Sequence, residues 1–330
     1  MAAKKRKNIV VIGGGTGTFT VLSGLKKYPY NLSAIVAMSD SGGSTGMLRD
    51  ELGVLPPGDV RNCLVALSSS DKLMRTLMNY RFDNGSLKGL SFGNLLLSAL
   101  EKITGSFDEA VEKASEVLRI RGRVIPATLD KVHLMAKVGT RTIKGEETIQ
   151  NSTLNGSLKK LWLAPSARAN KKALTAIREA DLIVIGPGNF YASIVTNLLV
   201  GGLSEAMRKS KAKKVFICNL MTKLEHTQGW SVADYASAVE KYLGGPVDVI
   251  VYNNKKPADA VLKKYAREGD TLTDWSELPT DTALVGANLM SNRAHVTNKI
   301  GTPSKESSLV RHDPAKLATV LVNVLEKKKK

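Results

Sequence analysis

The chain has 330 residues, of which 43% are hydrophobic, and carries a formal net charge of +18 at pH 7. A chain of this length can bury a large core, and no apolar run approaches the roughly 20 residues that a membrane helix needs, which excludes a membrane-spanning protein. The charge favours a polyanion-binding protein, but the basic residues are dispersed and aromatic residues, which stack on bases, make up only 5%. We therefore predict a protein without a specific nucleic-acid partner, with basic tails at residues 1–7 and 327–330.

Short β-branched runs alternate with helical patterns along most of the chain, and a loop rich in glycine, serine or asparagine follows most runs. The runs predict strands at residues 8–12, 34–38, 181–185, 215–218, 247–251 and 282–285. They are continuously apolar, as is typical of strands buried on both faces of a parallel sheet. The alternation with helices predicts an α/β fold: a Rossmann-like, doubly wound, mostly parallel sheet in one domain of residues 8–326.

Residues 59–150 break this alternation and are predicted to form a mainly helical insertion packed on the sheet. Helical patterns cover 61–78, 91–103 and 108–119, and apolar residues recur at three-to-four spacing in the last of them. Short strands are expected over 124–149, with Gly139 and Gly145 at turns.

The first glycine-rich loop follows the first predicted strand and opens the first helix. Glycine lets the backbone approach a phosphate closely, and the N–H groups of a helix N-terminus attract anions. The spacing differs from G-x-G-x-x-G because Thr18 replaces the third glycine, and no Gly-Lys-Ser/Thr of a P-loop follows. The loop therefore favours a phosphate site over an NAD site, with a purely steric tight turn as the alternative. Its residues are Gly13, Gly14, Gly15, Thr16, Gly17 and Thr18.

The second loop follows the second strand and combines hydroxyl donors and glycines with one carboxylate. Ligands of open α/β sheets bind outside the carboxyl ends of the strands. Asp40 can accept from a ribose hydroxyl or hold Mg²⁺, and its alternative role is a helix N-cap or an Asx-turn. N–H and O–H donors for phosphate oxygens come from Ser41, Gly42, Gly43, Ser44 and Thr45.

Later loops add weaker signals. A glycine turn meets a helix start at Gly188 and Asn189, and Tyr191 either covers a base or sugar or packs in the core. Uncharged side chains that can contact a base edge or sugar hydroxyls follow the fourth and fifth strands: Asn219, Thr222 and Asn253. Candidate phosphate clamps, with surface ion pairs as the alternative, are Arg49 and Arg61, and Asp59 is expected to be a helix N-cap.

No catalytic constellation accompanies these loops. The sequence lacks a G-x-S-x-G elbow, an H-E-x-x-H helix and a cysteine–histidine pairing. Its two cysteines, Cys63 and Cys218, have neither metal-site nor disulfide-framework spacing and are expected to be buried free thiols. The sequence thus indicates a binding crevice more clearly than a reaction, and no catalytic residue is assigned.

Seven segments occur in a characteristic order: IGGGTGTFTVLSGLKKY, SDSGGSTGMLRDELGVLPPGDVRNCLVAL, YRF, SFGNLLLSALEKITG, RVIPAT, ADLIVIGPGNFYASIVTNLLV and CNLMT. Over residues 8–325 the chain resembles the bacterial gluconeogenesis factor family (YvcK-type), which is related to the CofD-type 2-phospho-L-lactate transferases. The resemblance implies a Rossmann-like sheet, a cytoplasmic location and binding of a UDP-sugar such as UDP-N-acetylglucosamine. Its motifs add Asn62, Asn94 and Phe190 to the expected ligand site.

The resemblance also implies a role in cell shape and morphogenesis during growth on gluconeogenic carbon sources, and it allows a cell-wall protein partner and a homo-oligomer. Its transferase relatives use Mg²⁺ and a deazaflavin acceptor, so an Mg²⁺-dependent transferase of a phosphate-containing group, with Asp40 as the catalytic residue, is the alternative function. The family loop usually has two adjacent aspartates, whereas Ser41 replaces the second here. That difference weakens a two-carboxylate metal site, and LPPGDVRN, SFGN and CNLMT place the chain nearer the non-transferase branch.

Overall fold

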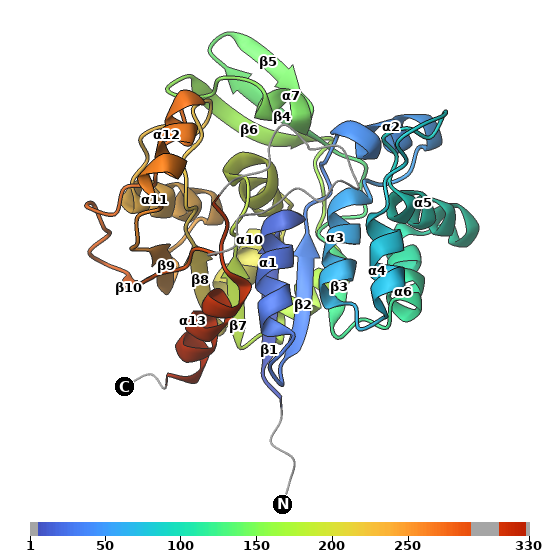
Figure 1. The fold of residues 1–330 in the computed structure, drawn as a ribbon, viewed down its shortest axis with the longest axis horizontal. Helices are drawn as coiled ribbons and strands as arrows, with labels where there is room; N and C mark the ends of the chain where they lie inside the picture. The colour runs from blue at the N-terminus through green and yellow to red at the C-terminus, as the bar shows by residue number, and fades with distance from the viewer. Residues whose placement is uncertain (1–5, 292–309, 328–330) are drawn as a thin grey trace, which may run out of the picture.

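The computed structural model describes residues 6–291 and 310–327 (Figure 1). One seven-stranded sheet runs through the molecule in the order β10-β9-β8-β7-β1-β2-β3, and all its neighbouring strands are parallel. The predicted doubly wound, mostly parallel α/β fold is therefore confirmed. The strands are β1 (Asn8–Gly13), β2 (Asn31–Val36), β3 (Arg123–Pro126), β7 (Leu182–Ile185), β8 (Lys213–Ile217), β9 (Val249–Asn253) and β10 (Ala283–Ala287).

The interior strand β1 is apolar on both faces because both faces are covered by helices. Ile9 and Val11 pack into one core layer, whereas Val10 and Ile12 pack into the other. Alternate side chains of a strand point to opposite faces, so a strand between two helical layers needs a continuous apolar run. The first layer contains α1 (Thr16–Leu25), α3 (Gly58–Leu67) and α13 (Pro314–Glu326), and the second contains α8 (Lys171–Arg178), α10 (Leu203–Lys209) and α11 (Val232–Leu243).

The helical insertion lies beyond the β3 edge of the sheet (Figure 1). Its helices are α4 (Lys72–Asn79), α5 (Phe92–Thr104) and α6 (Phe107–Val117). The prediction of one helix over 61–78 is wrong, because α3 ends at Leu67 and Asp71 caps a new helix by accepting from the Met74 N–H. Three serines separate the two helices, and serine hydroxyls compete with the helical hydrogen-bond pattern.

The segment predicted as short strands divides between two sheets. β3 joins the main sheet beside β2, whereas β4 (His133–Val138), β5 (Arg141–Lys144) and β6 (Leu158–Ala164) form a small antiparallel sheet, which thus extends beyond residue 150. Gly139 lies at the predicted turn between β4 and β5, with φ +57°. Gly145 instead precedes a short helix, α7 (Glu146–Gln150), so the strand predicted there is wrong. Figure 1 shows the small sheet above the carboxyl ends of the main strands.

The other helices are α2 (Gly43–Leu52), the π-helical turn η1 (Phe190–Val195), α9 (Thr196–Leu198) and α12 (Asp259–Arg267). Within the described ranges, none of the helices combines the length and the hydropathy that crossing a bilayer requires. Cys63 and Cys218 are both buried and free, as predicted.

Candidate functional site

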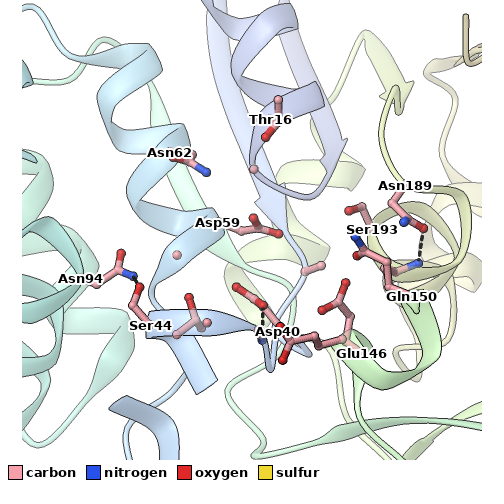
Figure 2. A pocket seen from close by; sticks show the side chains of 18 of the residues that line it. Thr16, Asp40, Ser44, Asp59, Asn62, Asn94, Glu146, Gln150, Asn189 and Ser193 are labelled. Atoms are coloured by element: carbon pink, nitrogen blue, oxygen red, sulfur yellow. Dashed lines mark hydrogen bonds between the residues drawn. The ribbon is translucent and has the colours of Figure 1, made fainter. Parts of the chain in front are cut away.

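A pocket of about 1050 Å³ opens at the carboxyl ends of β1, β2 and β7. These strands are neighbours in the sheet, so the loops that follow them meet at one place. Figure 2 shows Thr16 at the top, Asn94 and Ser44 on one side, Asn189 and Ser193 on the other, and Asp40 between them. The insertion and α7 complete the wall, so the pocket is built from segments that are far apart in the sequence.

Most of the predicted loop residues line this pocket. The lining includes all three glycine-rich loops, and the binding role of these residues remains a prediction. The predicted residues that line the pocket are Gly15, Thr16, Gly17, Asp40, Gly42, Gly43, Ser44, Thr45, Arg61, Asn62, Asn94, Gly188 and Asn189.

Other predicted residues support the pocket without lining it. Gly13, Gly14 and Thr18 are buried beneath the first loop. Arg49 does not line the pocket, and its guanidinium donates to the Val132 carbonyl oxygen, just before β4. Ser41 is also outside the lining and accepts a hydrogen bond from the backbone of α7.

The aromatic residues after β7 belong to the core. Tyr191 is 7% exposed, and Phe190 lies edge-to-face with Trp230 and Tyr235, at ring-centroid distances of 5.2 and 5.6 Å. Tyr191 therefore packs in the core, which is one of the two roles expected for it.

The polar residues after β8 and β9 fix loops rather than face the pocket. Asn219 donates to the Gly188 carbonyl oxygen at 3.0 Å, which ties the β8 loop to the β7 loop. Thr222 and Thr271 share a hydroxyl hydrogen bond of 2.7 Å. Asn253 accepts from the Leu289 N–H at 3.1 Å.

Four of the helices that begin at the pocket have an N-cap residue whose side chain makes no capping hydrogen bond. These are α1, α2, α3 and α5, with N-cap residues Gly15, Gly42, Pro57 and Ser91. By contrast, α4, α6, α8, α11 and α13 begin with a capping side chain, although α10 and α12, which begin away from the pocket, are uncapped as well. The first N–H groups of a helix have no partner within it and carry partial positive charge. Several uncapped N-termini directed at one pocket form a surface that favours an anion.

Two glycines of the first loop allow close packing around these helix N-termini. A Cβ at Gly17 would lie 1.8 Å from the carbonyl oxygen of Pro187, so the first loop and the β7 loop touch through their backbones. A Cβ at Gly15 would lie 2.4 Å from a carboxylate oxygen of Asp59. The steric role of glycine is thus present in the same loop that exposes N–H groups to the pocket.

Carboxyl groups from three segments face the same pocket: Asp40, Asp59 and Glu146 (Figure 2). Burial, then the nearby Asp40 charge, raises the pKa of Asp59 to about 7, although the Gly15 N–H that donates to it opposes the shift. Burial, then the charges of Asp40 and Asp59, raises the pKa of Glu146 to about 8. Burial also raises the pKa of Asp40. Mutual repulsion and poor hydration therefore keep part of this acid cluster protonated near neutral pH.

The roles of these acids differ from the sequence expectation. Asp59 is not the N-cap of α3, a position that Pro57 occupies; it lies in the first turn and points into the pocket. Asp40 accepts from the Gly42 N–H at 2.9 Å, so it forms the predicted Asx-turn and lines the pocket as well. Glu146 was not singled out from the sequence, because its segment was expected to be a strand.

Ser41 connects the second loop to α7. Its hydroxyl accepts from the Glu147 N–H at 3.2 Å. The position where the family usually has its second aspartate thus carries a hydroxyl that anchors α7, and α7 brings Glu146 and Glu147 to the lining. The acidic pair after Gly145 is a sequence signal that could have identified this helix start.

Uncharged and basic groups complete the far wall. Asn94 is 2% exposed and donates to the Ser44 hydroxyl at 3.2 Å, while its Oδ1 has no hydrogen-bond partner. A buried acceptor without a partner costs free energy unless a ligand or water satisfies it. Arg81 and Lys88, which were also not singled out from the sequence, line the same wall, and Arg81 donates to the Ser44 hydroxyl at 3.2 Å.

The acid cluster does not form a complete metal cage by itself. Across residues 6–291 and 310–327, no three His, Cys, Asp or Glu side chains are placed to hold a metal ion together. Mg²⁺ commonly uses one or two carboxylates, waters and ligand phosphates. Asp40 and Asp59, beside uncapped helix N-termini, fit that shared mode of binding. The lining contains hydroxyl groups but neither cysteine nor histidine, so it offers no thiol–imidazole or hydroxyl–imidazole pair.

Comparison with known proteins gives one consistent family. The profile of the family described as 2-phospho-L-lactate transferase CofD matches residues 9–285. A putative gluconeogenesis factor of Thermotoga maritima is 42% identical, over 96% of this chain and 98% of its own length. The gluconeogenesis factor of Bacillus subtilis is 39% identical, over 98% and 99%. The crystal structure of a UPF0052 family protein from Bacillus halodurans aligns with a TM-score of 0.86 and 36% identity, over 97% and 100%.

Proposed function

Because the chain belongs to the CofD family and its relatives along the whole length are gluconeogenesis factors, we propose that it is a regulatory factor that binds a nucleotide-sugar. The ligand we propose is UDP-N-acetylglucosamine or a close analogue, bound in the pocket above β1, β2 and β7. The proposed role is control of cell shape and morphogenesis during growth on gluconeogenic carbon sources. That biological role follows from the family resemblance, and the ligand class is supported by the pocket.

The observation that carries the ligand class is the set of uncapped helix N-termini at α1, α2, α3 and α5. A diphosphate is the part of a nucleotide-sugar that such a surface would bind, since N–H groups and helix dipoles favour phosphate oxygens. Arg61 and Arg81 lie on the same side and can add charge-assisted hydrogen bonds.

Uncharged groups around the diphosphate position suit a sugar and a base. The unpartnered Oδ1 of Asn94 would accept from an N–H or O–H of the ligand. Asn189, Ser193 and Asn62 offer further amide and hydroxyl groups. A pocket of about 1050 Å³ is at the large end of small-molecule sites, which suits a two-part ligand better than a lone phosphate.

Calorimetric titration of the full chain with UDP-N-acetylglucosamine, UDP, GDP and NAD, each with and without Mg²⁺, tests the proposal. We expect saturable binding of the UDP-sugar, weaker binding of UDP, and no product. Absence of binding by all four ligands would overturn the proposal, and steady turnover of the UDP-sugar without an added acceptor would overturn the regulatory part of it.

Two variants sharpen this test. Gly15→Val forces a branched side chain against Asp59 and should abolish binding. Asn94→Ala removes the unpartnered acceptor and should weaken binding about tenfold, the equivalent of one polar contact. Asn323→Ala, on the exposed face of α13, is the matched control and should bind like the wild type.

The second candidate is an Mg²⁺-dependent transferase of a phosphate-containing group to a deazaflavin-like acceptor. The observation that favours it is the acid cluster of Asp40, Asp59 and Glu146, in a chain whose family is described as 2-phospho-L-lactate transferase CofD. When bound, Mg²⁺ would neutralise phosphate charge, and Asp40 and Asp59 would hold it together with the ligand phosphates.

Assay of product formation with a deazaflavin acceptor separates the two candidates. If the chain is a transferase, product should form only with Mg²⁺. Activity should also fall at least about a hundredfold in Asp40→Ala, since loss of a metal-binding carboxylate removes several kcal/mol of charge stabilisation. Unchanged activity in Asp40→Ala, or no activity with the acceptor, contradicts it.

A further inference from the structure

A second pocket lies at the amino-terminal ends of the parallel strands, opposite the ends that carry the first pocket. It has a volume of about 1070 Å³ and is bounded by the start of β1, the turn from α1 to β2 and the segment that enters β3. In Figure 1 this edge is at the lower end of the molecule, where the chain enters β1. It shares no lining residue with the nucleotide pocket at the other end.

Cationic side chains dominate this second pocket, which we call the basic pocket. Glu179 contributes the one carboxylate among its lining residues. In the described part of the chain, none of its cations lies within ion-pair distance of a carboxylate. The cationic lining residues are Arg6, Lys26, Lys27, Arg121 and Arg123.

A structural role accounts for part of this charge only. Lys26 follows the last turn of α1 and donates to the Ala66 carbonyl oxygen at 2.7 Å, so it stabilises the ends of two helices. Arg121 and Arg123 have no comparable role. Both are exposed, both lie at the start of β3, and neither guanidinium makes a hydrogen bond within the described residues.

These cations also repel one another. Burial lowers the pKa of Lys26, and the charges of Arg75, Lys27 and Arg121 lower it further. A concave surface that concentrates one sign of charge attracts counter-ions of high charge density. Residues that are dispersed in the sequence are thus brought by the fold to one cavity.

We propose that the basic pocket binds a small ligand that carries a chain of phosphate groups. Guanidinium groups bind phosphate oxygens in bidentate geometry, and Arg121 and Arg123 are free to do so. Two sources have this chemistry: an inorganic oligophosphate and a nucleoside triphosphate. Tyr28 and Tyr30 line the same pocket, with stacked rings whose centroids are 6.3 Å apart, and offer ring surface to a base.

Calorimetric titration of the full chain with inorganic tripolyphosphate and with ATP at low ionic strength tests this proposal. Arg121→Ala/Arg123→Ala should weaken tripolyphosphate binding at least about tenfold, because charge-assisted hydrogen bonds are lost, and should leave the melting temperature unchanged. Tighter binding of ATP than of tripolyphosphate to the wild type would identify the nucleotide as the source, and equal or weaker binding would identify the free oligophosphate.

The matched control is Arg141→Ala/Arg267→Ala, which removes two exposed arginines from β5 and α12 and changes the net charge equally. It should bind tripolyphosphate like the wild type. Equal losses in both double variants would show general electrostatic attraction and overturn the proposal, as would wild-type affinity in Arg121→Ala/Arg123→Ala. Displacement of tripolyphosphate by duplex DNA with a steep salt dependence would identify a nucleic-acid surface and overturn the small-ligand assignment.

An oligophosphate can also enter the nucleotide pocket, so each titration is repeated with UDP-N-acetylglucosamine at saturating concentration. The binding event lost in Arg121→Ala/Arg123→Ala must be the one that the UDP-sugar does not displace. The same variant should bind the UDP-sugar with unchanged affinity. If the UDP-sugar bound neither the wild type nor the variants, that result would contradict the proposed function but not the proposal for the basic pocket.

Discussion

Around the first loop of the pocket, the partial positive charge of a helix N-terminus lies beside the negative charge of carboxylates. The Gly15 N–H, at the start of α1, already donates to Asp59, and the same helix end is where a ligand phosphate would bind. Asp40 and Glu146 add negative charge nearby. A phosphate can occupy this place only when protons or a cation reduce that charge, so binding of the ligand is linked to one or the other.

The first prediction concerns ligand affinity and pH. Without a divalent cation, UDP-sugar binding should be accompanied by proton uptake, and affinity should rise as pH falls from about 8 to 6, because Asp59 and Glu146 have pKa values raised to about 7 and about 8. Mg²⁺ should reduce this dependence by neutralising the same carboxylates. Calorimetry in two buffers of different ionisation enthalpy measures the proton count, and proton release without Mg²⁺ would contradict the argument.

The second prediction concerns stability of the ligand-free protein. Because the folded-state pKa of Asp59 is raised above its ordinary value of 3.8 to about 7, the folded state keeps a proton that the unfolded state has lost between these values. The free energy of unfolding should therefore fall as pH rises from about 4 to about 7. Asp59→Asn should flatten this decline in chemical denaturation. The exposed control Asp281→Asn should not, and an unchanged slope in Asp59→Asn would refute the assignment.

The third prediction concerns the backbone contact at Gly17. Gly17→Ala should destabilise the fold by about 2 kcal/mol or more, because its Cβ would lie 1.8 Å from a carbonyl oxygen that cannot move alone. Gly42→Ala is the matched control: φ is −88° and the nearest atom to the added Cβ is 3.5 Å away. Its stability should change by less than about 0.5 kcal/mol. Urea denaturation of both variants checks this, and equal stability would contradict the steric argument.

At the scale of helices and strands, local sequence accounts for elements with a strong pattern. The interior strands of the main sheet were predictable because burial on both faces demands uninterrupted apolar residues. The break at residues 68–71 was not, because Met74 and Met78 continue the helical spacing while the serines end the helix. The helix α13 was not predicted, and β6 was missed because Lys159 and Lys160 interrupt its apolar pattern.

The candidate site likewise contains some residues that local sequence predicts and others that it does not. Glycine-rich loops could be recognised because glycine and hydroxyl residues have local reasons to occur there. The pocket positions of Asp59 and Glu146 depend on how α3 and α7 pack against loops from distant strands, which no local pattern specifies. Tyr191 shows the converse, since its place beside a glycine turn suggests a ligand contact while tertiary packing buries it.

The fourth prediction concerns the attachment of α7 to the second loop. Ser41→Ala removes the acceptor of the Glu147 N–H and should cost about 1 kcal/mol of local stability. Hydrogen exchange of the α7 amides should therefore accelerate several-fold. Ser115→Ala, whose hydroxyl bonds within α6, is the control and should leave α7 exchange unchanged. Equal protection of α7 in Ser41→Ala would show that other contacts hold this helix.

Across the whole molecule, the two ends of the parallel strands carry different surfaces. The carboxyl ends carry acids, glycine loops and uncapped helix N-termini, whereas the amino ends carry the basic pocket. Acidic lining residues are therefore concentrated in the first pocket, whereas basic residues dominate the second. The sheet separates them, and each pocket draws its walls from segments on both sides of β1.

The position of β1 between β2 and β7 also has a consequence for the order in which the chain is synthesised. β1 pairs with β2 on one side, about twenty residues later, but its other neighbour is β7, at Leu182–Ile185. An unpaired strand edge is prone to associate with other chains. A fragment of residues 1–170 should thus aggregate on expression, whereas 1–330 stays monodisperse, as size-exclusion chromatography would show. On the ribosome, the whole segment between β1 and β7 must emerge before β1 acquires its second partner.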